Sequence, residues 1–284
     1  MKKFRRSGRL VDMTNYLIQN PHQLIPLTYF SDRYESAKSS ISEDLTIIKE
    51  IFESQDIGVL LTVAGASGGV KYIPTANEDE IVQSLKKLCM KLEDANRVLP
   101  GGYLYMMDII GNPKLMNEIG RYFATLFADT KVDVIMTMAT KGIPLAYAVA
   151  TYLNVPVCIV RHEHRITEGS LVSINYVSGS TKRIQTMSLA KRSLNEGSNV
   201  LIIDDFMKAG GTIRGMISLV EEFNSNVVGT GVLVEAEHTE ERLVDEYISM
   251  TRLSEVNTKE KIVKVEIGNF FEKLKNHKQQ VQED

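Results

Sequence analysis

The sequence has little that would mark a secreted or membrane-spanning protein. It contains only two cysteines, Cys89 and Cys158, and their spacing matches no metal-binding pattern, so we expect buried thiols in a reducing cytoplasm. No apolar run approaches the roughly 20 residues that a membrane span needs, and residues 1–6 lack the apolar core of a secretory signal. We therefore expect a cytoplasmic protein with no membrane contact.

A large excess of charge of one sign is also absent. The net charge is −3, which argues against a protein that coats nucleic acid over its whole surface. The charge is unevenly placed, however, because residues 1–9 carry five cations and no acid: Lys2, Lys3, Arg5, Arg6 and Arg9. At 284 residues the chain is long enough for one large domain or two ordinary ones.

The most informative stretch is 200–212. Four apolar residues, 200–203, are typical of a buried strand, and Asp204 and Asp205 stand where we expect that strand to end. A loop of small residues, 208–212, follows, and apolar residues at helical spacing begin at Ile213. The order strand, loop and helix N-terminus predicts an anion site, because a helix start offers free N–H groups and glycines let them approach a phosphate.

The two acids need a different partner from the phosphate. They would repel an anion, so we expect them to accept hydrogen bonds from sugar hydroxyls or to reach a metal-bridged group. The alternative is an ordinary strand-to-helix turn, but two adjacent acids at a strand end would then have no reason to be there.

Residues 1–75 have the pattern of a winged helix. Helical stretches are predicted at 9–20 and 31–37, and a third starts at Lys38, Ser39 and Ser40, where Ser40 and Glu43 fit a capping box. Segments 59–63 and 70–73 then form a predicted β-hairpin, the wing.

This arrangement predicts DNA binding. The candidate contacts are the basic tail, the start of the third helix and the wing: Lys3, Arg5, Arg6, Arg9, Lys38, Ser39, Ser40 and Lys71. Basic and acidic residues nearly balance over 1–75, so a small docking or oligomerisation domain with a solvated tail is the alternative.

Residues 76–284 show repeated strand–helix units, which indicate an α/β domain with a parallel sheet. We predict strands at 132–138, 155–160 and 227–236, helices at 77–96, 114–129, 143–153 and 240–247, and a frayed tail from Lys273. The first of these helices fits the core, a linker or a dimer contact equally well. Segment 161–189 departs from the alternation and has the pattern of a hairpin rich in Ser, Thr and Gly. It suits a mobile cover over a ligand, with a plain surface hairpin as the alternative.

The 204–212 run resembles the fingerprint of the type I phosphoribosyltransferases, which bind phosphoribosyl pyrophosphate (PRPP). The family shows two acids, three variable residues and a Gly-Gly-Thr-like ending. The variable residues here are Phe206, Met207 and Lys208, and Ala209 stands where the enzymes commonly have Thr. The resemblance implies that Gly210, Gly211 and Thr212 hold the 5′-phosphate and that the acids face the ribose.

A second loop, Ala139, Thr140, Lys141 and Gly142, resembles the family's pyrophosphate loop in position and character. Mg²⁺ usually accompanies PRPP because the pyrophosphate chelates it, so few protein ligands are required. We therefore expect no dedicated metal site and no required cofactor, with PRPP as an effector that brings Mg²⁺.

Over residues 3–270 the chain is similar to the purine operon repressors of Gram-positive bacteria. The matching stretches are 4–9, 37–43, 100–103, 139–142, 167–170, 173–179 and 204–212. The resemblance implies an N-terminal winged helix fused to a phosphoribosyltransferase-like domain with a hairpin hood. It also implies a homodimeric repressor of purine biosynthesis and transport genes, in which PRPP weakens the grip on operator DNA, and it adds Tyr103 and Arg161 to the PRPP contacts.

Two other functions stay open. An active purine phosphoribosyltransferase with an accessory domain would explain Asp204, Asp205 and Thr212, although Lys208 and Ala209 count against catalysis. A protein–protein adaptor would explain the N-terminal domain with no DNA contact. The operator, its affinity, activation of some targets, competition by other phosphorylated nucleotides and the roles of His162 and His164 are not decided by the sequence.

Overall fold

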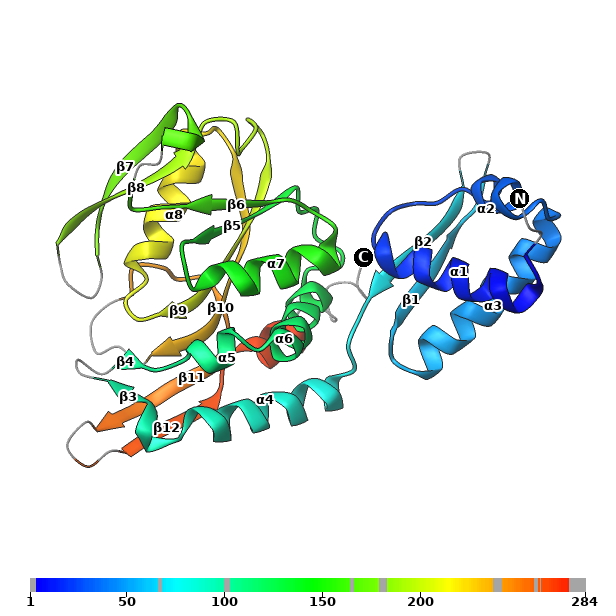
Figure 1. Cartoon of the computed structure of the whole chain (residues 1–284). Coiled ribbons are helices and arrows are strands. Elements are labelled where there is room, and N and C mark those ends of the chain that lie inside the picture. The colour runs from blue at the N-terminus through cyan, green and yellow to red at the C-terminus, as the bar shows by residue number, and fades with distance from the viewer. Residues whose placement is uncertain are drawn as a thin grey trace. The chain divides into compact units, whose positions relative to one another are not determined.

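The N-terminal part of the chain forms three helices followed by a β-hairpin (Figure 1). The computed structural model describes residues 4–65, 68–99, 103–163, 166–178, 183–236, 242–257, 260 and 262–275. The chain divides into two compact units, residues 1–78 with 152–154, and residues 79–151 with 155–284.

The N-terminal unit has the helix order of a winged helix. Its elements are α1 (Arg6–Gln19), α2 (Leu27–Tyr34), α3 (Lys38–Ser54), β1 (Gly58–Val63) and β2 (Gly69–Pro74). One apolar core joins them because each helix buries one side, with Leu17 from α1, Phe30 from α2, Ile48 and Phe52 from α3 and Leu60 from β1 all buried. The hairpin is antiparallel, with Leu60 opposite Tyr72.

The predicted start of the second helix is wrong, whereas the third helix starts at Lys38 as predicted but lacks its predicted capping box. The second helix begins at Leu27 and ends by residue 35, because Pro26 fixes an extended backbone before it and Glu35 adopts the left-handed conformation after it. The third helix begins at Lys38 after Ala37, which makes no side-chain cap, so Ser40 lies inside the helix and the capping box does not form.

The C-terminal unit is built on a six-stranded sheet of order β12-β11-β10-β9-β5-β6. Its strands are β5 (Val134–Met138), β6 (Val157–Val160), β9 (Asn199–Met207), β10 (Asn226–Ala236), β11 (Ile248–Asn257) and β12 (Ile262–Ile267). All neighbouring pairs are parallel except β11–β12. The helices of this part are α4 (Glu78–Leu92), α5 (Met107–Ile110), α6 (Pro113–Leu126), α7 (Gly142–Leu153) and α8 (Gly211–Glu222), with short pieces η1 (Ala95–Arg97), η2 (Ile166–Glu168), β3 (Val98–Leu99) and β4 (Tyr103–Leu104).

Strand pairing brings the two predicted loops to one edge of the sheet. β5 and β9 are parallel neighbours, with Val134 opposite Val200, so the segments that follow them leave from the same edge. The next strand, β10, pairs with β9 up to Glu235 opposite Met207.

The segment predicted as a cover forms a hairpin, β7 (Leu171–Val177) and β8 (Ile184–Ala190). It packs on α8 at Gly215, where an added Cβ would lie 2.5 Å from Met187 Cε and 3.1 Å from Tyr176 Cγ. Glycine at this position therefore allows the hairpin to lie directly against the helix. The predicted Gly179, Ser180 and Thr181 of its turn lie outside the described residues.

Three predictions for the end of the chain need correction. Residues 242–247 are not helical, and 240–241 lie outside the described residues. β11 and β12 were missed, since β11 buries the polar residues Ser249 and Thr251, and the edge strand β12 alternates exposed charges with buried valines. Residues 270–275 form a helical turn with Leu274 buried, so the chain does not fray at Lys273. None of the helices in the described ranges combines the length and hydropathy needed to cross a bilayer.

Candidate functional site

The turn from β9 into α8 forms an anion-binding geometry. Gly210 precedes α8 with φ +85°, a left-handed conformation that a residue with a side chain adopts only under strain. The Gly210 position supplies no side-chain cap for this helix start, and the first turn of α8 carries no acid. The N–H groups of the first turn therefore stay available for an anionic ligand.

The acid pair lies inside β9, and the predicted strand end at residue 203 is wrong. The ladder with β10 continues to Met207, which keeps the backbone extended through both acids. Asp204 is 5% exposed and Asp205 is half-buried. The Asp204 carboxylate accepts a hydrogen bond from the backbone N–H of Asp205, at 3.0 Å.

Burial dominates the electrostatics of this pair. Desolvation, followed by the negative charge of Asp205, raises the pKa of Asp204 well above its usual value. Desolvation also raises the pKa of Asp205, and the positive charge of Lys141 acts against that rise. The site therefore holds two carboxyl groups that a ligand with hydroxyl donors or a cation would stabilise in the ionised form.

Loop 139–142 closes on the acid pair at Gly142. A Cβ on Gly142 would overlap Thr137 Oγ1 and lie 2.5 Å from Asp204 Oδ1, so only glycine permits this approach. The Thr137 hydroxyl is fully buried and has no hydrogen-bond partner among the described residues. The Ala139–Thr140 peptide bond is cis. The structure thus brings the two predicted loops together around Asp204.

Arg161 and the hairpin border the same edge. A cavity of about 240 Å³ is lined by Ala139, Thr140, Arg161, His162 and Glu163. Arg161 Nε donates to Glu168 Oε1 at 2.8 Å. His162 is exposed, with Nδ1 3.1 Å from the Thr186 carbonyl and its ring stacked on Tyr176 at 6.2 Å. The β7–β8 hairpin is therefore connected to this cavity through His162.

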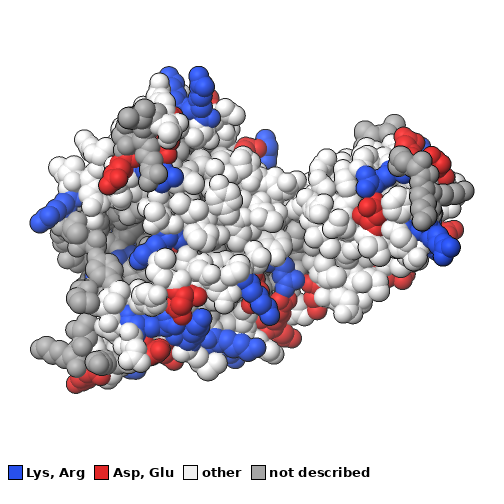
Figure 2. Space-filling view, in the orientation of Figure 1, with Lys and Arg blue, Asp and Glu red and all other residues white. Residues whose placement is uncertain are grey.

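The predicted DNA contacts at the N-terminus are not equivalent. Arg6 Nε and Arg9 Nε donate to the two oxygens of Asp44 at 2.9 and 2.5 Å, and the Asp44 side chain is 0% exposed. Arg9 also donates to Ser36 Oγ at 3.2 Å, and its side chain is 12% exposed. Arg9 is therefore engaged inside the unit, whereas Arg5 is exposed. Figure 2 shows basic side chains of this unit beside acidic ones.

The remaining predicted contacts are distributed over α3 and the hairpin. Lys38 and Ser39 are exposed at the start of α3, while Ser40 and Lys71 are half-buried. Lys3 lies outside the described residues, as does His164, and nothing is described of the Tyr103 side chain.

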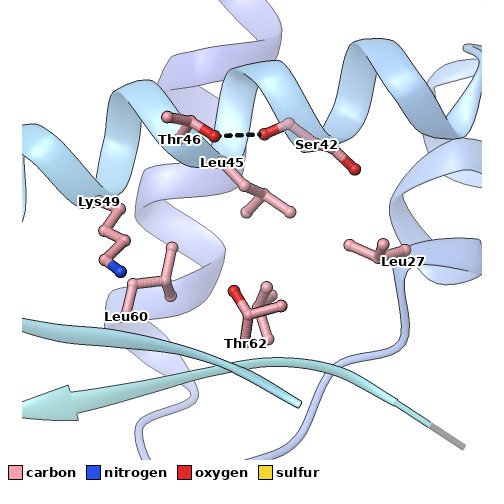
Figure 3. Close-up of a pocket in the computed structure, with 8 residues that line it drawn as sticks. Leu27, Ser42, Leu45, Thr46, Lys49, Leu60 and Thr62 are labelled. Atoms are coloured by element: carbon pink, nitrogen blue, oxygen red, sulfur yellow. Dashed lines mark hydrogen bonds between the residues drawn. The ribbon is translucent and has the colours of Figure 1, made fainter. Parts of the chain in front are cut away.

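Beyond its first turn, α3 carries a polar row that sequence reasoning missed. Ser42, Thr46 and Lys49 line a cavity of about 210 Å³ between α3 and the hairpin, opposite Thr62 (Figure 3). Thr46 Oγ1 donates to the Ser42 carbonyl at 3.0 Å. The signal was in the sequence, because residues at i, i+4 and i+7 share one side of a helix.

Comparison with known proteins finds two family models that match separate parts of the chain. Residues 5–74 match the family described as bacterial purine repressor, N-terminal, and residues 107–267 match the phosphoribosyl transferase domain. The chain is 64% identical over 275 residues to the purine biosynthesis transcriptional repressor PurR of Bacillus subtilis, covering 97% of this chain and 96% of that protein. The chain belongs to the bacterial purine repressor family. The predicted fold class is thereby confirmed.

Within the bacterial purine repressor family the names of the relatives differ in the direction of control. A protein of Lactococcus lactis subsp. lactis, 45% identical over 267 residues, is named purine biosynthesis transcriptional activator PurR, with 94% of this chain and 98% of that protein covered. Among solved structures, the adenine phosphoribosyltransferase of Thermoanaerobacter pseudethanolicus aligns with a TM-score of 0.51 at 22% identity, covering 58% of this chain and 97% of that one. That likeness supports the fold of the C-terminal unit.

Proposed function

We propose that this member of the family is a DNA-binding repressor of purine biosynthesis genes and that PRPP lowers its affinity for DNA. The observation that carries the proposal is the 64% identity over nearly the whole length to a protein named as a purine biosynthesis transcriptional repressor. The relative named as an activator is more distant, at 45% identity, which favours repression here.

The DNA-binding part is residues 1–75, and the effector part is residues 76–284. Exposed Arg5, Lys38 and Ser39, with Lys71 on the hairpin, are the groups best placed to meet phosphates and base edges. A unit of this size offers only a few cations, so specific binding needs two copies on one operator. We therefore propose a cytoplasmic homodimer.

The effector site is the edge formed by loop 139–142 and by segment 204–212, which contains the end of β9 and the loop before α8. Free N–H groups at Gly210–Thr212 suit the 5′-phosphate, and the second loop with Lys141 suits the pyrophosphate. Asp204 and Asp205 suit the ribose hydroxyls, since hydroxyl donors would offset the burial of their carboxylates.

Mg²⁺ would enter with the ligand. The described residues contain no cluster of three or more His, Cys, Asp or Glu side chains that could hold a metal. An ion that the pyrophosphate chelates needs few protein ligands, and Asp204 and Asp205 are the carboxylates of this site that could reach it. Bound Mg²⁺ would offset the negative charge of the pyrophosphate.

Catalysis is the second candidate, because residues 107–267 match a domain that takes its name from a transferase. Transfer of a base to the sugar requires the site to hold that base and stabilise a cationic sugar. Lys208 places a cation in the loop, which favours keeping the polyanion intact, and Ala209 replaces a hydroxyl common in the enzymes. We expect no nucleotide to form when the protein is incubated with PRPP and adenine, guanine, hypoxanthine or xanthine. Turnover at an ordinary enzymatic rate would show that the protein is a phosphoribosyltransferase.

The decisive experiment is a titration of operator DNA with and without PRPP. Millimolar PRPP with Mg²⁺ should release DNA from the wild type. Release requires that PRPP bind the DNA-free form of the protein more tightly than the DNA-bound form. The Asp204→Asn/Asp205→Asn variant should bind PRPP at least tenfold more weakly in calorimetry, since each lost hydrogen bond to a charged group is worth about 1.5–3 kcal/mol. This variant should also remain bound to operator DNA when PRPP is added. Equal release from both proteins, or equal release by pyrophosphate alone, would mean that PRPP acts as a bulk polyanion.

A further inference from the structure

A six-residue segment, Arg242–Tyr247, lies directly behind the loop that we assign to the 5′-phosphate. The Leu243 N–H donates to the Ala209 carbonyl at 3.0 Å. A Cβ placed on Gly210 would lie 3.1 Å from Val244 Cγ2, and Val244 is itself buried. We call this segment the brace. It contacts the loop at the two residues that precede α8, so its position limits where the first N–H groups of α8 point.

Both ends of the brace bind one buried carboxylate. Glu235 Oε2 accepts from the Tyr247 hydroxyl at 2.5 Å and pairs with Arg242 Nη2 at 3.0 Å. The Arg242 guanidinium also lies over the Tyr247 ring at 5.1 Å and donates to the Ala236 carbonyl at 3.1 Å. Glu235 comes from β10 opposite Met207, which places the carboxylate level with the start of the loop.

Burial of the charged groups Glu235 and Arg242 costs free energy, which a role in fixing the conformation of the brace would explain. The Glu235 side chain is 6% exposed, and Arg242 Nη1 is buried with no hydrogen-bond partner among the described residues. Buried ionic groups often stabilise a fold less than apolar packing would, so a specific conformation is what such a cluster supplies. Burial, and then the hydrogen bond to Glu235, raise the pKa of Tyr247 to about 12, so its hydroxyl stays a donor at neutral pH.

We propose that Glu235 is a positioning residue for the phosphate loop. By holding Arg242 and Tyr247 it fixes the brace, and the brace keeps Gly210–Thr212 in the conformation that aims their N–H groups at the ligand phosphate. Glu235 itself does not touch the ligand. This inference rests on the proposed PRPP site and assigns a role to residues outside both of its loops.

The test separates the two halves of the site with two part-ligands, ribose 5-phosphate and pyrophosphate, each titrated by calorimetry against the full-length protein. Tyr247→Phe removes one donor to Glu235, and Glu235→Gln leaves one oxygen in place of two. We expect both variants to bind ribose 5-phosphate about fivefold to tenfold more weakly and pyrophosphate within twofold of wild type. Their affinity for operator DNA without ligand should be unchanged.

Thr251→Val is the matched control. It removes the buried hydrogen bond from Thr251 Oγ1 to the Leu233 carbonyl, at 2.9 Å. This bond joins β10 to β11, the two strands that precede and follow the brace in the sequence, and it does not involve the brace. It should leave both part-ligands within twofold. Parallel loss of both ligands in Tyr247→Phe, or loss of neither, would overturn the positioning role. If the wild type binds neither ribose 5-phosphate nor PRPP, the proposed effector site fails and the inference fails with it.

Discussion

The two units differ in the partners that they provide for a buried carboxylate. In the N-terminal unit Asp44 is 0% exposed, and both of its oxygens accept from arginines, Arg6 and Arg9. In the C-terminal unit Asp204 is 5% exposed, but it accepts from the adjacent backbone N–H, and burial raises its pKa well above the usual value. The first carboxylate is paired within the fold, whereas the second is held in a state that favours a proton or a ligand.

This difference distinguishes an acid that is paired within the fold from the acid that we propose binds the ligand. A buried charge costs free energy unless the protein pairs it. Asp44 is paired by its own chain, so it stabilises α1 against α3. Asp204 lies next to Asp205, which is also desolvated. The nearby Thr137 hydroxyl has no hydrogen-bond partner in the described part of the chain, so the polar groups at this edge of the sheet are buried with few partners. The following predictions test the comparison, from the largest effect to the smallest.

Asp44→Ala should destabilise the N-terminal unit by about 3 kcal/mol or more, because it leaves Arg9 largely buried without its carboxylate. Chemical denaturation followed by a signal from the N-terminal tyrosines would measure this. Glu43→Ala is the matched control, since Glu43 is exposed and lies 3.7 Å from Arg6, and it should change stability by less than about 1 kcal/mol. Equal effects would show that Asp44 does not hold the two helices together.

Asp204→Asn should have the opposite sign and raise stability at neutral pH. The pKa of Asp204 is raised in the folded state, so protonation stabilises the fold at low pH and that contribution is lost as pH rises through the folded pKa. Asn keeps the acceptor for Asp205 N–H and carries no charge. We expect a gain of about 1 kcal/mol at pH 7, or roughly 2–4 °C in Tm, that disappears near pH 4. A gain that persists at pH 4 would show that desolvation is not its cause.

The smallest effect distinguishes an exposed N-terminal cation from one that Asp44 binds. Arg5 is exposed, whereas Arg9 is engaged by Asp44 and Ser36. Arg5→Gln should therefore reduce the salt dependence of DNA binding by about one unit of slope, as expected for one lost phosphate contact. Arg9→Gln should change that slope by clearly less, measured at a temperature where both variants are folded. The reverse order would mean that Arg9 leaves Asp44 when DNA binds.

The local sequence was sufficient for most of the elements up to β10 and for the loops of the candidate site. Apolar spacing predicted the helices and the parallel strands up to β10, and the acids followed by Gly210, Gly211 and Thr212 predicted a strand–loop–helix anion site. The positive φ of Gly210 agrees with the choice of glycine there. These features depend on residues close together in the chain, so a pattern can reveal them.

Features that depend on distant partners were not predictable in this way. The strand end at residue 203 was wrong because pairing with β10 carries β9 through both acids. The engagement of Arg9 depends on Asp44, 35 residues away. The brace looked helical in sequence, but its residues bond to distant partners, with Arg242 and Tyr247 bound to Glu235 and the Leu243 N–H bound to the Ala209 carbonyl.

The sequence by itself determined that this protein has a winged-helix pattern, a glycine-containing loop between a strand and a helix, and two adjacent acids. Its likeness over nearly the whole chain supplied the family. The tertiary structure alone decided which cations stay exposed, which buried acid is paired with arginines, and which distant residues contact the loop at Ala209 and Gly210. The physical reason is that burial and pairing depend on what lies across the fold, and a charge gains or loses its partner only when distant segments pack together.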